Sequence, residues 1–254
     1  MSVKSVSRAL DLLEALAVPE EVGLVELATR TGLQPSTAHR LLGTLIERRY
    51  VVQSAATGRY LLGHKLNEIA VAVAKRTEHL RELARPHLET IKKVTGESAN
   101  LTVLEPPNIV YVDQVEGSRS VRMFARIGAA VPAYATAAGK AMLAQMPPAV
   151  VREIYGDAPL EQLTPRTIAS VEALLAELDE VRERGFGVDR EEQEPGVGCV
   201  AAPIRGDGAV VGALSVSAPM PRIDAADPAE LGELLISRAD AVSMSLGFVV
   251  GSRR

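Results

Sequence analysis

The stretch QPSTAHRLLGTL, residues 34–45, decides the fold of the N-terminal part of this chain. Pro35 suits the first turn of a helix, where hydroxyl side chains can also satisfy unpaired amides. Apolar residues at helical spacing predict a buried face, formed by Ala38, Leu41, Leu42, Leu45 and Ile46. The outward face is then formed by Ser36, Thr37, His39 and Arg40. Such a face either meets nucleic acid or simply caps a surface helix.

Two helices before this stretch and a hairpin after it predict a winged helix-turn-helix. Apolar spacing indicates helices over residues 4–17 and 24–31. Residues 50–53 and 59–62 read as two short strands around a turn that contains Gly58. In this arrangement the third helix enters the major groove of DNA and the hairpin reaches the flanking backbone. Helix-turn-helix shapes also serve as protein-binding modules, so that alternative stays open.

The chain has a net charge of -4, which by itself argues against binding to DNA, but the charge is unevenly distributed. Residues 28–65 contain the basic residues Arg30, Arg40, Arg48, Arg49, Arg59 and Lys65. Glu47 is the one acidic residue in that range, so the acidity lies elsewhere. A positive patch on an acidic protein is typical of a DNA-contacting module attached to another domain, although ordinary surfaces also carry arginines. The predicted DNA contacts are Gln34, Pro35, Ser36, Thr37, His39, Arg40 and, on the hairpin, Arg59.

Residues 63–96 form a predicted helical connector in which Pro86 marks a break or kink. Its alanine-rich first half, residues 66–74, is more apolar than a solvated spacer needs. This half serves either as a dimer contact or as a surface that packs on the C-terminal domain. The expected domains are a winged helix-turn-helix over residues 1–63, a linker helix over 64–78, and an effector-binding and oligomerisation domain over 79–254.

The remainder of the chain predicts an α+β domain with an antiparallel sheet, because strands and helices do not alternate regularly. The expected strands are residues 98–104, 109–115, 120–126, 187–190, 198–205 and 210–217. The expected helices are residues 137–145, 148–155, 167–184 and 227–249. Two hairpin turns are indicated by EPPN at residues 105–108 and GDG at residues 206–208.

The positions of the histidines argue against an enzyme. All four, His39, His64, His79 and His87, precede residue 90. The segment that carries Cys199 therefore has no histidine to activate a cysteine or serine nucleophile. The single cysteine excludes an internal disulfide and a cysteine-built zinc site, and no acidic cluster at ligand spacing accompanies the histidines. The rival hypothesis is a small-molecule enzyme with Cys199 as nucleophile and an accessory N-terminal domain.

The stretch ATAAGKAM, residues 135–142, resembles a phosphate-binding loop without being one. Tyr134 stands where such a loop needs its first glycine, and Lys140 is followed by Ala141 instead of a hydroxyl residue. What remains is a predicted helix start, where the amides of Ala137 and Ala138 face any anion placed before them. A small carboxylate would fit there.

Polar residues also interrupt the apolar strands near the C-terminus. They are Asp189, Cys199, Ser215 and Ser217. The two serines are two positions apart and share one face of their strand. This face either lines a cavity for a small polar ligand or exposes the serines to solvent, with Asp189 as a structural residue at a turn.

In order along nearly the whole chain, five motifs resemble the IclR family of bacterial transcriptional regulators. They are SVSRALDLLEAL, LVELATRTGLQPSTAHRLLGTLIERRYV, GRYLLGHKL, AYATAAGKAML and GFGVDREEQEPGVGCVAAPI with VGALSVSAP. The resemblance implies a winged helix-turn-helix joined by a linker helix to a GAF-like effector domain, α+β overall. It also implies a dimer or a dimer of dimers on a near-palindromic operator in double-stranded DNA.

The resemblance further implies a ligand-responsive regulator whose C-terminal pocket binds a small organic acid, with no catalytic residue, metal or cofactor. Its effector contacts would be Ala137, Ala138, Asp189, Cys199, Ser215 and Ser217, with apolar walls from Met123, Phe124, Met142 and Leu143. One departure is Arg205-Gly206, where the family usually has an aromatic residue or histidine and then Asp or Asn. We expect a cytoplasmic protein, because acidic residues interrupt the N-terminal apolar stretch and the longest apolar runs are too short to span a bilayer.

Overall fold

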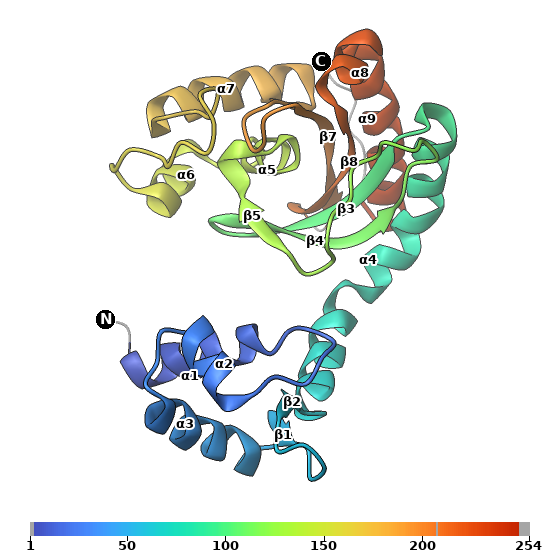
Figure 1. Cartoon of the computed structure of the whole chain (residues 1–254). Coiled ribbons are helices and arrows are strands. Elements are labelled where there is room, and N and C mark those ends of the chain that lie inside the picture. Colours follow the sequence, from blue (N-terminus) through green and yellow to red (C-terminus); the bar gives the residue numbers. More distant parts are fainter. Residues whose placement is uncertain (1–2, 207, 249–254) are drawn as a thin grey trace. The chain divides into compact units, whose positions relative to one another are not determined.

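The computed structural model describes residues 3–206 and 208–248, and Figure 1 shows the elements that they form. The chain divides into two compact units, residues 1–77 and 78–254, and the long helix α4 (Lys65–Thr95) runs from the first into the second. The first unit otherwise contains α1 (Lys4–Ala15), α2 (Leu24–Arg30), α3 (Pro35–Glu47), β1 (Val51–Gln53) and β2 (Tyr60–Leu62).

The first unit is a winged helix-turn-helix, as predicted. Leu12 of α1, Leu27 of α2 and Leu42 of α3 are fully buried in one small core. The wing strands β1 and β2 are antiparallel, and Val51 and Tyr60 turn inward onto that core. Burial of one apolar stripe per helix is what holds so small a unit together, since short helices are marginal by themselves.

The start of α3 differs from the prediction in one respect. Gln34 is the N-cap residue, its side chain makes no capping hydrogen bond, and Pro35 occupies the first turn. In the described part of the chain, the hydroxyls of Ser36 and Thr37 do not bond to the amides that they were expected to satisfy. Both hydroxyls therefore remain available to an external partner.

Of the predicted break or kink at Pro86, the break is wrong, because α4 continues through this residue. Proline removes one backbone hydrogen bond from a helix interior. In α4 the loss is offset by packing, since Leu80, Ala84, Leu88 and Ile91 are buried against the sheet of the second unit. The sequence signal of a single proline was overridden by this tertiary contact.

The second unit is an α+β domain built on an antiparallel sheet in the order β5-β4-β3-β8-β7-β6. Its strands are β3 (Ser98–Glu105), β4 (Asn108–Val115), β5 (Ala130–Pro132), β6 (Gly187–Arg190), β7 (Val197–Gly206) and β8 (Ala209–Pro219). Its other helical elements are the 3-10 turn η1 (Ala133–Ala135), α5 (Ala137–Leu143), α6 (Pro148–Tyr155), α7 (Val171–Arg184), α8 (Met220–Ala225) and α9 (Pro228–Ser245).

The curled sheet has a separate hydrophobic core on each face. Leu88 of α4, Ile223 of α8 and Leu235 of α9 pack with Val216 of β8 on one face. On the other face α5 lies in the hollow of the sheet, and α7 packs outside it (Figure 1). All residues of α5 are buried because it is enclosed between the sheet and α7.

One predicted strand is wrong and one helix was missed. Residues 120–126 form no strand, and the sheet instead gains β5, in which Val131 pairs with Ile109. Val121 and Phe124 are exposed, so the apolar pattern of this segment does not reflect a buried sheet face. Helix α8 was missed because its sequence, MPRIDA, is too short to show helical periodicity.

The remaining differences are at element ends. Helix α7 begins at Val171 because the Ser170 side chain caps it by accepting a hydrogen bond from the Ala173 amide. Helix α9 begins after Asp227, which caps it in the same way. The predicted extension of this helix to Val249 and the centre of the GDG turn at residue 207 lie outside the described residues.

We predict that Gly139→Ala destabilises the second unit by about 3 kcal/mol, the upper range for an overpacked core. A Cβ atom at Gly139 would lie 2.0 Å from the backbone oxygen of Ala133, which cannot move without shifting the start of α5. Chemical unfolding would measure the loss. Gly206→Ala is the control, because its Cβ would meet only flexible side chains, the nearest at 3.4 Å. Equal stability of the two variants would contradict the prediction.

Candidate DNA-reading helix and effector cavity

The polar front of α3 is presented to solvent. Gln34, Pro35, Ser36, His39 and Arg40 are exposed and Thr37 is half-buried, whereas Ala38 is fully buried. In the part of the chain that the structure describes, the side chains of His39 and Arg40 make no hydrogen bond or ion pair. Hydrogen-bonding groups held on a rigid helix without internal partners are suited to reading an external surface.

Arg59 in the wing has internal partners. Its Nε donates to the backbone oxygen of Glu21 at 2.9 Å, and its Nη2 pairs with Glu26 at 3.2 Å. The side chain is still 47% exposed. This ion pair contributes little to stability at such exposure, so Arg59 could exchange it for a phosphate contact.

The predicted effector residues of the sheet lie in one cross-strand row. Asp189 of β6 pairs with Cys199 of β7, and Cys199 pairs with Ser217 of β8. The Cys199 Sγ and Ser217 Oγ atoms are 3.3 Å apart. Ser215 shares the same face one pair further along β8. Strand pairing, which the sequence does not display, brings these residues together from three separate segments.

A cavity of about 180 Å³ opens on this face and is called the effector cavity below. Ser217 lines it, together with Met123 and Phe124 of the loop after β4 and with Tyr111 of β4. The predicted apolar walls Met142 and Leu143 do not belong to this described lining, because both are fully buried in the core of α5.

A polar chain that sequence reasoning missed runs along the floor of the effector cavity. The Asn100 amide donates to Ser217 Oγ at 3.1 Å and to Ser215 Oγ at 3.4 Å. Gln114 donates to Asn100 Oδ1 at 2.7 Å and accepts a hydrogen bond from the Ala125 amide at 3.3 Å. The chain therefore orients both serines and connects them to the loop that covers the cavity. The alternation of polar and apolar residues in β3 around Asn100 was the sequence signal that could have predicted this polar chain.

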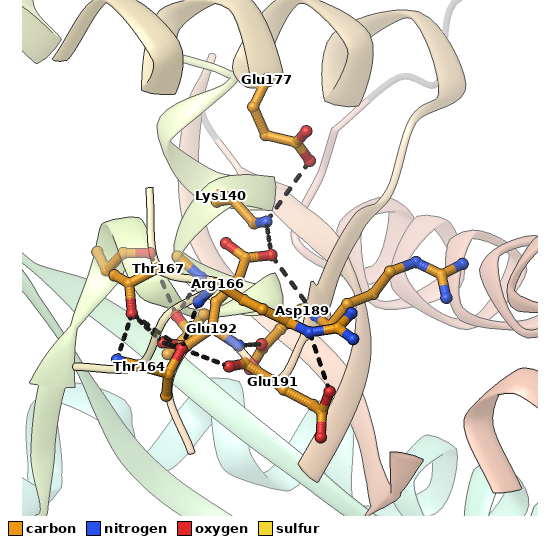
Figure 2. A network of polar contacts seen from close by, with 12 residues as sticks. Lys140, Thr164, Arg166, Thr167, Glu177, Asp189, Glu191 and Glu192 are labelled. Carbon is orange, nitrogen blue, oxygen red and sulfur yellow. Dashed lines mark hydrogen bonds and ion pairs between the residues drawn. The ribbon is translucent and has the colours of Figure 1, made fainter. Parts of the chain in front are cut away.

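A buried ion pair fixes the turn that follows β6 (Figure 2). Lys140 of α5 has a side chain that is 1% exposed, and its Nζ lies 2.5 Å from Glu192 Oε1 and 3.5 Å from Glu177 Oε1. The hydroxyl of Thr167 donates to the backbone oxygen of Glu192 at 2.6 Å, and Thr164 donates to that of Glu191 at 2.7 Å. The network thus ties the turn to α5, to α7 and to the loop before α7.

Asp189 connects this network to the row of effector residues. Its Oδ1 accepts a hydrogen bond from the Glu192 amide at 2.7 Å. Burial raises the pKa of Asp189 to about 7, and the nearby Glu192 carboxylate adds to the rise. Burial also raises the pKa of the Cys199 thiol to about 12, so that Cys199 is a neutral thiol at physiological pH.

The raised pKa of Asp189 predicts a pH dependence of stability. A carboxyl group whose pKa is higher in the folded state binds its proton more tightly there, so its stabilising contribution is complete below the unfolded pKa near 3.8 and is lost as pH rises through about 7. We therefore expect wild type to lose stability relative to Asp189→Asn between about pH 4 and about pH 8. Urea unfolding of both proteins across this range would measure it, and a constant difference would contradict the assignment.

The described residues contain no group of three or more His, Cys, Asp or Glu side chains that could hold a metal ion. No helix among them is long and apolar enough to cross a membrane.

The fold defines the class of DNA-binding regulators with an effector domain. Its marks are an N-terminal winged helix-turn-helix, a helix that continues into a second unit, and a curled antiparallel sheet with a polar cavity. Comparison with known proteins identifies the family. Residues 5–55 match the IclR helix-turn-helix domain, and residues 71–244 match the bacterial transcriptional regulator IclR C-terminal domain. The chain belongs to the IclR family of bacterial transcriptional regulators.

Individual relatives cover nearly the whole chain. The HTH-type transcriptional regulator KdgR of Escherichia coli is 35% identical over 248 residues, which are 97% of this chain and 94% of that protein. The crystal structure of Thermotoga maritima IclR is 32% identical with a TM-score of 0.76, covering 96% of this chain and 99% of that one. An IclR homologue from Microbacterium hydrocarbonoxydans, complexed with 4-hydroxybenzoate, is 26% identical with a TM-score of 0.76 and the same coverage.

Proposed function

We propose that this chain controls transcription by reading a near-palindromic operator with α3 and by binding a small carboxylate in its C-terminal unit. The exposed, internally unpartnered front of α3 on a winged helix-turn-helix is the observation that carries the proposal. The proposed domains are residues 1–63 for DNA binding, 64–78 as linker helix and 79–254 for effector binding and oligomerisation. The proposed DNA contacts are Gln34, Pro35, Ser36, Thr37, His39, Arg40 and Arg59.

The proposed effector site uses the amides of Ala137 and Ala138 and the side chains of Asp189, Cys199, Ser215 and Ser217. Its support is the cross-strand row described above, in which Ser217 lines the cavity and Cys199 Sγ lies 3.3 Å from Ser217 Oγ. Asp189, Cys199 and Ser215 do not belong to the described lining of the cavity, so a ligand would have to reach past Ser217 to contact them. At neutral pH Asp189 is protonated in a large fraction of molecules, since its pKa is about 7. A protonated Asp189 repels an anionic ligand less than a carboxylate would and can donate a hydrogen bond to it.

A homodimer or a dimer of dimers is the assembly that suits such an operator, because half-sites one helical turn apart match two copies of α3. Ile69, Val71 and Val73 of α4 are 41%, 55% and 53% exposed in the single chain and would gain burial in a dimer. We place the regulator in the cytoplasm because that is where its DNA partner lies. Binding of the effector would alter the spacing of the two α3 helices and hence operator affinity.

We propose that the chain is not an enzyme. Cys199 is the candidate nucleophile of the rival hypothesis, and burial holds its pKa at about 12, whereas reactive cysteines have lowered pKa values. No histidine follows residue 90 in the sequence, so the C-terminal strands carry no general base of that type. A Cys199→Ser variant with normal operator and ligand binding would support a purely binding role.

The experiment that tests DNA reading is selection of sites from a random duplex pool by the purified protein at two salt concentrations. Enrichment of an inverted repeat is expected. Weak binding that is indifferent to sequence and disappears as salt rises would mean that the basic surface is not a reader. The selected operator then serves to test whether effector binding changes operator affinity. A suitable first probe is 4-hydroxybenzoate, the ligand named for the Microbacterium homologue.

We predict that Ser217→Val weakens binding of 4-hydroxybenzoate or of a better-fitting small carboxylate by about tenfold, the value of one hydrogen bond to a charged group. Valine removes the hydroxyl and with it the contact with Asn100, and it is larger than serine by one non-hydrogen atom. Isothermal titration calorimetry measures the affinity, and Ser237→Val on α9, outside the cavity lining, is the control. A carboxylate that binds both variants equally well does not use the proposed site.

A further inference from the structure

A second cavity lies on the opposite face of the sheet from Ser217. Its volume of about 650 Å³ is within the range of small-molecule sites. Val216 lines it, whereas Ser217 lines the effector cavity, because successive residues of a strand face opposite sides. The apolar part of its wall is formed by Val94, Val216, Ile223, Ala225, Leu231 and Leu234. We call it the α9-face cavity.

Charged residues gather on the wall of the α9-face cavity around one buried carboxylate. The Glu97 side chain is 8% exposed. Arg222 of α8 places its Nε 2.8 Å from Glu97 Oε1, and its Nη2 donates to Oε2 at 2.9 Å. Arg119 places its Nε 2.8 Å from Oε1. Two guanidinium groups on one carboxylate leave an excess positive charge around Glu97. Glu230 also lines the cavity and makes the whole lining neutral, but within the described part of the chain the structure gives it no ion pair with Arg119 or Arg222.

Arg119 has hydrogen-bond donors that are not used within the protein, whereas the side chain of Arg222 is held in place by its contacts. Nη2 of Arg222 also donates to the backbone oxygen of Val121 at 2.7 Å. Arg119 is 53% exposed, and among residues 3–206 and 208–248 its terminal nitrogens make no hydrogen bond. Arg119 can therefore turn these nitrogens toward an incoming anion while Arg222 continues to neutralise Glu97.

We propose that the α9-face cavity is a second ligand site for an amphipathic monoanion, with the apolar body on the wall and a single carboxylate or sulfonate on Arg119. The site is separate from the effector cavity and does not rest on the proposed function. Val94 and Thr95, the last residues of α4 before the sheet, line it. A ligand bound there contacts the helix whose first turns belong to the DNA-binding unit.

The probe is anilinonaphthalene sulfonate, which joins an apolar ring system to one anionic group and fluoresces when it leaves water. We expect the folded wild-type protein to bind it saturably, and Arg119→Gln to weaken binding by about tenfold through loss of the charged contact. Arg122→Gln is the matched control, because Arg122 lies on the same loop and pairs with Glu116 but does not line the cavity. Leu234→Trp, which fills the cavity, is expected to abolish binding.

Each remaining outcome is informative. Equal binding by wild type and Arg119→Gln overturns the proposal, as does an absence of saturable fluorescence from the folded protein. Loss of binding in Ser217→Val with none in Arg119→Gln would place the probe in the effector cavity and also overturn it. Affinity that falls as protein concentration rises would show that a second copy of the chain covers the cavity, which also overturns the proposal. Thermal melting confirms that each variant is folded. If Leu234→Trp does not fold, the comparison of Arg119→Gln with wild type decides the proposal.

Discussion

Arg40→Ala is expected to weaken binding to the selected operator by about 10- to 100-fold, the range of a guanidinium contact to a base edge. Arg40 is exposed on α3, one turn after Ser36, and has no internal partner among the described residues. Its loss costs no intramolecular contact, so the folded unit stays intact and the effect appears in DNA affinity. Fluorescence anisotropy with the operator and with a scrambled duplex measures both affinity and selectivity.

The control is Arg48→Ala, at the C-cap of the same helix. It removes the same charge from the end of α3 that lies farthest from its polar front. We expect Arg48→Ala to weaken binding to both duplexes to a similar degree and to reduce the salt dependence of that binding, as loss of a phosphate contact does. If Arg40→Ala behaved in the same way, Arg40 would be a backbone contact and base reading would fall to other residues of α3.

Lys140→Met is expected to destabilise the second unit by about 3–5 kcal/mol, because it leaves the Glu192 carboxylate buried without its cation. Lys140 Nζ is 2.5 Å from Glu192 Oε1, and the other oxygen, Oε2, is buried with no hydrogen-bond partner among the described residues. Glu177 keeps Arg184 at 2.8 Å and is less affected. Urea unfolding gives the free energy, and a fall in melting temperature on the order of 10 °C is expected.

A second variant separates the loss of charge balance from the loss of volume. Lys140→Met combined with Glu192→Gln removes both charges while keeping two side chains of similar size. We expect the double variant to recover most of the stability, because replacing a whole buried ion pair costs far less than removing one partner. If the double variant were as unstable as Lys140→Met, the packing of α5 and not the ion pair would account for the effect.

Most of the local elements and the fold class of each unit could be predicted from the sequence, because their signals are local. The buried stripe from Ala38 to Ile46 predicts α3, and Gly58 between two short strands predicts the wing. Such patterns reflect which side of one element meets its own core. They fail where the decisive contact is distant, as at Pro86, where packing on the sheet keeps α4 intact, and at residues 120–126, where an apolar pattern belongs to an exposed loop.

The candidate sites divide in the same way. The sequence by itself determined the polar front of α3 and the alternation that puts Ser215 and Ser217 on one face, because both follow from the repeat of a single element. Only the tertiary structure decided that Asn100 bonds both serines, that Lys140 is buried against Glu192, and that Glu97 gathers two arginines. These partners lie up to 125 positions apart in the chain, and only the pairing of strands and the packing of helices bring such distant side chains together.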